Sequence, residues 1–202
     1  MPETVVNTFF PVGEQKKFSV EEFFTLTASR PEEERWQLID GVLMRSPRPT
    51  LVHQRIASNL THALNEHFRS HRRDVFAYYS VGLIVPDAEL FRPEADVAVL
   101  DALADYESYA KKFYLVAEIL SDSNTDKDIA VKRQRYLQHP DNLYFALIEQ
   151  KRMRLELLAR TTGWQPMVLE TPDAILELPE FGFRKPLGDL YRGTPLAPSA
   201  QA

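Results

Sequence analysis

The 202-residue chain contains no cysteine, and its seven glycines are scattered. The lack of cysteine excludes disulfide bonds, thiolate–zinc sites and cysteine nucleophiles, so any metal must be bound by oxygen or imidazole ligands. The glycines form neither a phosphate-cradling loop nor a dinucleotide fingerprint. We therefore expect no nucleotide cofactor such as ATP or NAD.

Long apolar runs are absent as well. No segment approaches the roughly 18 apolar residues that a membrane span needs. The first residues, MPETVVNTFF, lack the basic region and apolar core of a secretory signal. We therefore expect a cytoplasmic protein with no membrane association.

The chain also lacks an excess of positive charge, because its formal net charge is -5. Neutralisation of phosphates by Lys and Arg supplies most non-specific affinity for DNA, so this charge argues against a grip spread over the whole surface. Local basic runs could still bind phosphates, although such runs more often form solvated helix faces and turns. The runs are Arg69, Arg72 and Arg73; Lys127, Lys132, Arg133 and Arg135; and Lys151, Arg152 and Arg154.

The composition is that of an ordinary globular protein, with 44% hydrophobic and 26% charged residues. The length suits one domain with a sizeable core. Residues 1–17 lack clear periodicity and predict an N-terminal arm, residues 18–193 predict the folded domain, and residues 194–202 predict a disordered tail.

Local signals define the first elements. Ser19 and Glu22 form the capping box of a helix that ends before Pro31. Asp40-Gly41 favours a tight hairpin turn between two short strands in WQLIDGVLM. From His53 to about Arg69, apolar residues recur every four positions, which predicts an amphipathic helix.

The rest of the chain predicts mainly strands. β-branched, aromatic and apolar residues predict strands at 75–85, 95–100 and 113–120, and the last is apolar on both faces, so it should be central. A helix over 126–138 precedes a hairpin formed by 142–150 and 153–159, and short strands at 164–169 and 174–178 follow. This order predicts a single α/β or α+β domain with a mixed β-sheet flanked by helices.

Two acids interrupt apolar strands. Glu118 lies in FYLVAEIL, where an unpaired carboxylate would be costly to bury, and Asp96 lies in ADVAVL. A structural salt bridge would explain Glu118, and so would a metal ion or a role as catalytic base. If these two strands are antiparallel neighbours, as the 12-residue connection between them permits, both carboxylates could converge on one cation.

Two carboxylates with open positions suit Mg²⁺ or Mn²⁺, which usually keep waters and accept phosphate oxygens. Such a metal activates water and polarises a phosphate, so the pattern indicates phosphoryl chemistry. Lys132 would complete the site, because Asp128, Lys132 and Tyr136 share one face of the predicted helix. An ordinary surface ion pair between Asp128 and Lys132 is the alternative.

Taken in order, WQLIDG, His53 at a helix start, ADVAVL, and EILSDSN followed by DIAVKRQRY resemble the Uma-two family of restriction endonucleases, within the PD-(D/E)XK nuclease superfamily. The resemblance covers roughly residues 18–190. It implies a restriction-endonuclease-like fold and a Mg²⁺-dependent endonuclease acting on DNA. It also implies that Asp96, Glu118 and the carbonyl of Ile119 are metal ligands, and that Lys132 positions the attacking water.

Three positions depart from the family's pattern. Ala95 precedes Asp96 where proline is frequent, which leaves Glu94 as an alternative acid, although the ADVAVL match favours Asp96. Leu120 occupies the usual lysine position, so Lys132 on the following helix is the natural supplier. Gln37 stands where glutamate is frequent, and its amide cannot bring negative charge to a metal.

Other arrangements are weaker. His53, His62, His67 and His71 share or flank one helix, but their spacing does not place three ligands on one face for zinc. Only His53 fits the family's pattern and could face the cleft. Pro86-Asp87 imitates the superfamily motif but is typical of a turn.

The sequence therefore supports two functions. One is a divalent-metal-dependent endonuclease that hydrolyses phosphodiester bonds in DNA. The other, favoured by Gln37 and the acidic net charge, is a catalytically weakened or inactive nuclease fold used for binding or oligomerisation. Nucleases that cut both strands often act as symmetric dimers, and strands near 142–178 could pair two chains, so we expect a homodimer.

Overall fold

The computed structural model describes residues 16–31, 33–103, 107–121 and 125–197. Its largest sheet contains β3 (Val75–Leu83), β4 (Glu94–Asp101), β5 (Tyr109–Ala110), β6 (Leu115–Leu120), β7 (Tyr144–Glu149), β8 (Leu155–Ala159) and β9 (Pro166–Leu169). The strand order is β5-β3-β4-β6-β7-β8-β9. The pairs β3–β5 and β6–β7 are parallel and the others antiparallel, so the sheet is mixed, as the sequence predicts.

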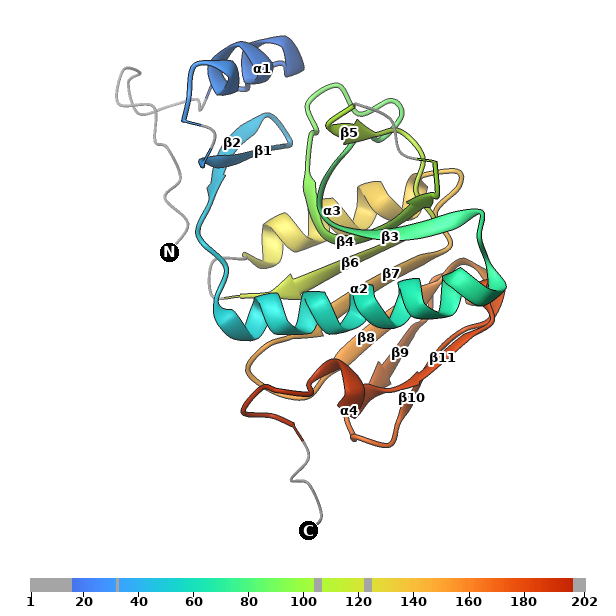
Figure 1. Cartoon of the computed structure of the whole chain (residues 1–202). Coiled ribbons are helices and arrows are strands. Elements are labelled where there is room, and N and C mark those ends of the chain that lie inside the picture. The colour runs from blue at the N-terminus through green and yellow to red at the C-terminus, as the bar shows by residue number, and fades with distance from the viewer. Residues whose placement is uncertain (1–15, 32, 104–106, 122–124, 198–202) are drawn as a thin grey trace.

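Helices and two small hairpins complete the domain (Figure 1). The helices are α1 (Val20–Ala28), α2 (Leu51–His71), α3 (Asp126–Gln138) and α4 (Leu187–Leu190), with 3-10 turns η1 (Arg160–Thr162) and η2 (Pro179–Phe181). The hairpins are β1 (Arg35–Ile39) with β2 (Val42–Ser46), and β10 (Ile175–Leu178) with β11 (Phe183–Pro186). Across the described ranges, no helix combines the length and apolarity needed to cross a membrane.

Both early local predictions are confirmed. The Ser19 side chain accepts a hydrogen bond from the Glu22 backbone N–H, and the Glu22 side chain accepts one from Ser19 N–H. The β1–β2 turn places Asp40 and Gly41 at φ values of 49° and 80°. A Cβ at Gly41 would lie 2.8 Å from Cβ of Lys17, so glycine is also required there by contact.

Several element boundaries differ from the predicted ones. The helix predicted to begin at His53 begins at Leu51, because the Thr50 side chain accepts a hydrogen bond from His53 N–H and caps α2. The predicted strand 75–85 ends at Leu83. The segment predicted to be a strand over 113–120 pairs as β6 only from Leu115.

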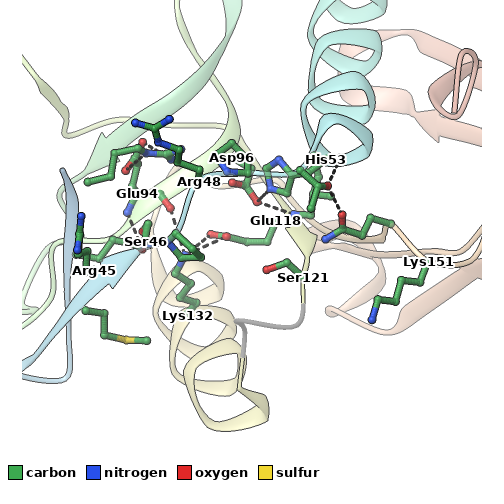
Figure 2. A pocket seen from close by; sticks show the side chains of 18 residues that line it. Arg45, Ser46, Arg48, His53, Glu94, Asp96, Glu118, Ser121, Lys132 and Lys151 are labelled. Atoms are coloured by element: carbon green, nitrogen blue, oxygen red, sulfur yellow. Dashed lines mark hydrogen bonds and ion pairs between the residues drawn. The ribbon is translucent and has the colours of Figure 1, made fainter. Parts of the chain in front are cut away.

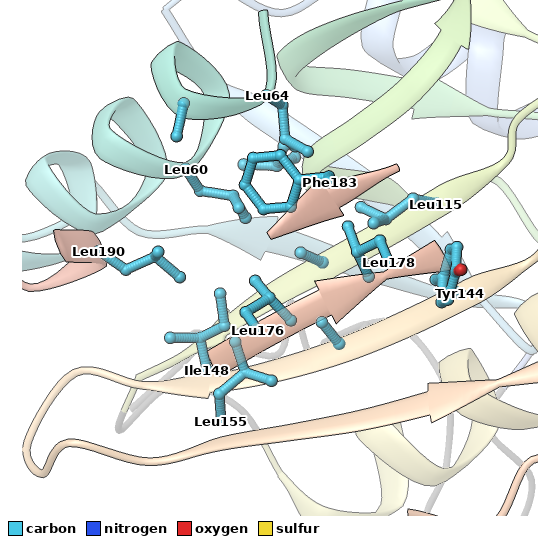
Figure 3. Packing of buried hydrophobic residues seen from close by; sticks show 14 of the residues in the cluster. Leu60, Leu64, Leu115, Tyr144, Ile148, Leu155, Leu176, Leu178, Phe183 and Leu190 are labelled. Atoms are coloured by element: carbon cyan, nitrogen blue, oxygen red, sulfur yellow. The ribbon is translucent and has the colours of Figure 1, made fainter. Parts of the chain in front are cut away.

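Two apolar layers cover the large sheet. The layer that includes α2 is drawn in Figure 3, where Leu60 and Leu64 lie near Phe183, while Leu176 and Leu178 of β10 face strands β6 to β8. The opposite layer contains Tyr136 of α3 with Phe113 and Phe145. Since β6 lies between these layers, five of its six residues are buried, in agreement with the predicted central strand.

The C-terminal segment is more ordered than its proline and glycine content suggests. Leu187 and Leu190 of α4 are fully buried, and the Tyr191 hydroxyl donates to the Glu149 carbonyl oxygen at 2.7 Å. The described chain continues to residue 197, and Thr194, at the predicted start of the tail, is buried. The predicted arm, apart from residues 16 and 17, and the tail from residue 198 lie outside the described residues.

A side chain of α2 covers part of the free edge of β3. Asn65 Nδ2 donates to the Ala77 carbonyl oxygen at 2.8 Å, and Asn65 Oδ1 accepts from Ala77 N–H at 2.7 Å. The amide thus makes the pair of hydrogen bonds that another strand would make, and it fixes α2 relative to the sheet.

We expect Asn65→Ala to lower the free energy of unfolding by about 2 kcal/mol, because it leaves both backbone groups of Ala77 without these partners. Glu66→Ala is the matched control, since Glu66 is exposed on the same helix, and it should change stability by less than about 0.5 kcal/mol. Urea unfolding followed by circular dichroism measures both. Equal stability of the two variants would show that the Asn65 amide does not hold the edge.

Candidate active site

A cavity of about 310 Å³ lies where β4 and β6 approach the start of α2 and the β1–β2 hairpin. Figure 2 shows Asp96 and Glu118 projecting into it from adjacent strands, with Lys132 approaching from α3. The two strands pair in antiparallel fashion through Val97 and Ala117, which confirms the predicted neighbours. The described residues therefore bring together the three side chains that the sequence singles out.

Asp96 lies next to Val97, the first residue of β4 that pairs with β6. Its Oδ2 accepts a hydrogen bond from Ile119 N–H at 2.7 Å, so the side chain bridges to β6. His53 Nε2 lies 3.2 Å from the same oxygen. Burial raises the pKa of Asp96, but the contacts with His53, the charge of Lys132 and the Ile119 N–H outweigh it, and the pKa is lowered.

Glu118 is 3% exposed and is held on three sides. Lys132 Nζ lies 3.0 Å from each of its carboxylate oxygens, and the Tyr136 hydroxyl donates to Oε1 at 3.0 Å. Burial raises the pKa of Glu118 to about 7, and the nearby charge of Asp96 adds to this, while Lys132 and Tyr136 act in the opposite direction. Glu118 is therefore poised to exchange a proton near neutral pH.

Helix α3 supplies both partners of Glu118. Lys132 and Tyr136 are one helical turn apart, so they face the sheet together, and both are buried. Lys132 Nζ also donates to the Glu94 carbonyl oxygen at 3.2 Å. Burial raises the pKa of the Tyr136 hydroxyl well above its usual value, and the Glu118 charge raises it further, so Tyr136 remains a donor.

Asp128 lies on the same helical stripe but does not line the cavity. Its N–H donates to Thr125 Oγ1 at 3.1 Å, and its carboxylate accepts from the Thr125 hydroxyl at 2.5 Å. Thr125 is therefore the N-cap of α3, and Asp128 in the first helical turn binds it through both its N–H and its carboxylate. The surface ion pair considered for Asp128 and Lys132 is replaced by the buried pair of Lys132 with Glu118.

Glu94 and Gln37 line the cavity and are both engaged in structural contacts. Arg35 binds the Glu94 carboxylate through two nitrogens, at 3.0 and 2.5 Å. Gln37 Oε1 accepts from Glu94 N–H at 3.0 Å, and Gln37 Nε2 donates to Ser46 Oγ at 2.8 Å. Gln37 thus fixes the start of β4, a task that uses both the donor and the acceptor of an amide.

Sequence reasoning missed most of the basic lining of the cavity. Arg35, Arg45 and Arg48 come from the β1–β2 hairpin and the segment before α2, and Lys151 comes from the turn between β7 and β8. Of these four side chains, only Lys151 belonged to a basic run named from the sequence. The signal that could have found Arg45 and Arg48 is RSPRPT, in which two arginines alternate with prolines directly before a helix cap.

The remaining sequence candidates lie outside this site. His67 and His71 stack on each other with ring centroids 4.4 Å apart, and His67 Nε2 contacts the Phe181 carbonyl oxygen. Asp87 occupies a turn with a φ of 56°. Within the described ranges, no group of three or more His, Asp or Glu side chains has a metal-binding arrangement, so Asp96 and Glu118 would need ligands such as a backbone carbonyl or water.

Comparison with known proteins identifies the family of the chain and a structure of similar fold. The Uma2 family, described as "Putative restriction endonuclease", matches residues 20–187. The chain belongs to the Uma2 family. Among solved structures, a "putative nuclease belonging to DUF820" from Anabaena variabilis ATCC 29413 has a similar fold, with a TM-score of 0.72, 18% identity, and coverage of 86% of this chain and 97% of that chain. No curated protein matches the chain.

In this Uma2 protein, we expect Lys132→Met to destabilise the fold more at high than at low pH. The raised pKa means that folded Glu118 binds its proton more tightly than the unfolded chain does, so its stability contribution is greatest below pH 4.5 and falls as pH rises through about 7. Without Lys132 this fall should continue above pH 7. The loss of stability should therefore be larger at pH 8 than at pH 5.5 by about 1.4 kcal/mol, the value of one pH unit above the Glu118 pKa.

Urea unfolding of wild type and Lys132→Met at the two pH values measures this difference. Arg133→Met is the matched control, because Arg133, next to Lys132 on α3, pairs with the partly exposed Glu156 of β8. A Lys132→Met effect that is the same at both pH values would show that the ammonium does not compensate the Glu118 charge.

Proposed function

We propose that this protein is a divalent-metal-dependent endonuclease that hydrolyses phosphodiester bonds in DNA. The observation that carries the proposal is the meeting of Asp96 and Glu118, from adjacent strands, with the buried Lys132 in one cavity. Buried acids are costly, and two carboxylates at one cavity wall are more than a single structural ion pair with Lys132 requires. Membership of the Uma2 family supports the nuclease function.

The donor set fits Mg²⁺ or Mn²⁺. Asp96 and Glu118 offer hard carboxylate oxygens on one cavity wall, and Ile119, whose carbonyl the family resemblance implies as a ligand, also lines it. Within the described residues, Asp96 accepts its hydrogen bonds through Oδ2. Its other oxygen, Oδ1, can therefore coordinate a metal ion. When bound, the metal would polarise the phosphate and lower the pKa of water.

The protein's own residues would orient this chemistry. Tyr136 holds the Glu118 carboxylate, and His53 with Ile119 N–H holds that of Asp96. Lys132 Nζ uses its hydrogen-bonding capacity on Glu118 and the Glu94 carbonyl oxygen. By exchanging one of these bonds for substrate, it would hold the attacking water or a phosphate oxygen in place and stabilise developing negative charge.

The rim of the cavity supports a phosphate-rich substrate. Five cationic side chains line it, against the three carboxylates of Glu94, Asp96 and Glu118 and that of Glu34, which pairs with Arg45 from outside the lining. This local excess of positive charge occurs in a chain with a net charge of -5, so affinity for nucleic acid would be concentrated at the site. The lining cations are Arg35, Arg45, Arg48, Lys132 and Lys151.

Gln37 favours a second candidate, a nuclease fold that binds without cutting. Its amide occupies a cavity position where an acid would add negative charge toward a metal, and it is used to bind Glu94 N–H and Ser46. Metal and DNA binding at this site without cleavage would favour that function.

A homodimer would suit cleavage of both DNA strands. Strand β9 is an edge of the large sheet, and Met167 and Val168 on it are 43% and 42% exposed. Pairing of two β9 strands about a twofold axis would bury these side chains and follow the symmetry of most dimers.

Purified protein should nick supercoiled plasmid DNA with Mg²⁺ or Mn²⁺ and not with EDTA. Asp96→Asn and Glu118→Gln should each lower the rate by about 100-fold or more, because loss of a partner behind a metal ligand already costs about 10- to 100-fold. Asp128→Asn is the control, since Asp128 lies outside the cavity and an asparagine oxygen can still accept the hydrogen bond from the Thr125 hydroxyl. Unchanged cleavage in both site variants would place the activity elsewhere.

The affinity for Mn²⁺ should rise by about tenfold between pH 6 and pH 8, because the proton on Glu118, with a pKa of about 7, competes with the metal. Asp96, with its lowered pKa, is ionised throughout this range. Titration calorimetry in buffers of different ionisation enthalpy measures both the affinity and the released proton. Glu118→Gln should weaken binding and remove the proton release, and a pH-independent wild-type affinity would contradict Glu118 as a ligand.

A further inference from the structure

A second cavity, of about 450 Å³, lies between α2 and β3, beside the candidate active site. The two cavities share Arg35, Pro49, His53 and Asp96 in their walls. We call the second cavity the α2–β3 groove. A nucleic-acid strand whose phosphate occupies the first cavity could place a neighbouring nucleotide in this groove.

The walls of the α2–β3 groove are polar on one side and aromatic on the other. Gln54, Ser58 and Thr61 lie along one face of α2, at intervals of about one helical turn. Tyr79 and Ser80 of β3 form the opposite wall. This mixture of hydrogen-bonding groups and one aromatic ring matches the two surfaces of a nucleobase, its polar edge and its flat face.

Tyr79 is placed where a core residue would be expected. It alternates along β3 with Val75 and Ala77, which are buried under α2, so it faces the same side of the sheet. Tyr79 is nevertheless 70% exposed. An exposed aromatic ring does not gain the free energy that its burial in the core would give. The exposed position of Tyr79 beside the active-site cavity therefore indicates that the ring contacts a ligand.

Two further features of the groove are unexplained by folding. Thr61 Oγ1 is buried, and among the described residues it has no hydrogen-bond partner. Ser80, next to Tyr79, has a φ of 52°, in the left-handed region, which interrupts the regular strand opposite Asp96. An unpaired buried hydroxyl and a local backbone distortion both call for an explanation, and here both belong to residues that line one groove.

We propose that the α2–β3 groove binds an unpaired nucleobase next to the reacting phosphate, with the base stacked on Tyr79 and its polar edge facing the exposed side chains of Gln54 and Ser58. This subsite rests on the proposed nuclease function, and it names the preferred substrate as a single strand, a flap or a frayed end. A base held in a duplex is stacked on its neighbours and would have to be extruded at a cost of a few kcal/mol.

The test uses a short single-stranded DNA that contains one 2-aminopurine, whose fluorescence is quenched by stacking, in EDTA so that no cleavage occurs. Wild type should quench the probe. Tyr79→Ala should weaken binding by about 5- to 150-fold and abolish the additional quenching, because stacking of one base on an aromatic side chain contributes this much. Tyr79→Phe should retain both properties, and Ser58→Ala should retain quenching with weaker binding.

Phe76→Ala is the matched control, since Phe76 is an exposed aromatic residue on the opposite face of the same strand, 43% exposed and packed against Tyr78. It should behave as wild type. Equal binding and quenching by wild type and Tyr79→Ala would overturn the subsite, and the plasmid assay then decides separately whether the nuclease function stands. Failure of wild type to bind the probe and to cut plasmid would overturn both.

Discussion

The buried ion pair between Lys132 and Glu118 is the constraint around which the site is organised. Glu118 lies in the central strand of the large sheet, under a helix, where a charge without a partner would be strongly destabilising. The ammonium on α3 compensates it, and Tyr136 one turn later satisfies one of the same oxygens. The position of α3 over the sheet is therefore fixed by polar contacts as well as by apolar packing, and the same contacts hold the carboxylate at the cavity wall.

The sequence predicted this part of the site because its signals are local. A carboxylate inside an apolar strand and a lysine and a tyrosine one turn apart on a helix are visible without any knowledge of the fold. The antiparallel pairing of β4 with β6 was also predicted, and it brings Asp96 beside Glu118. The resemblance to the Uma2 family joined these signals and is confirmed by the family match.

The rest of the cavity could not be read from the sequence, because it depends on contacts between distant segments. Arg35 meets Glu94 across 59 positions of sequence, and the groove beside Tyr79 exists only because α2 covers Ala77 and not the next residue on that face. Asp128 illustrates a different limit. It shares a helical stripe with Lys132, but at the first turn its carboxylate and N–H bind Thr125. The predicted strands at 164–169 and 174–178 correspond to β9 and β10, whereas β11 and α4 were missed because such short elements, next to proline and glycine, carry weak periodicity.

The Asn65 amide has a consequence for how copies of this protein can associate. By bonding both backbone groups of Ala77, it blocks part of one edge of the large sheet against an incoming strand, and β5 covers another part. The opposite edge, β9, has no such cover in the described part of the chain. A sheet that can extend in only one direction cannot grow into a fibre, so strand pairing through β9 would stop at two molecules.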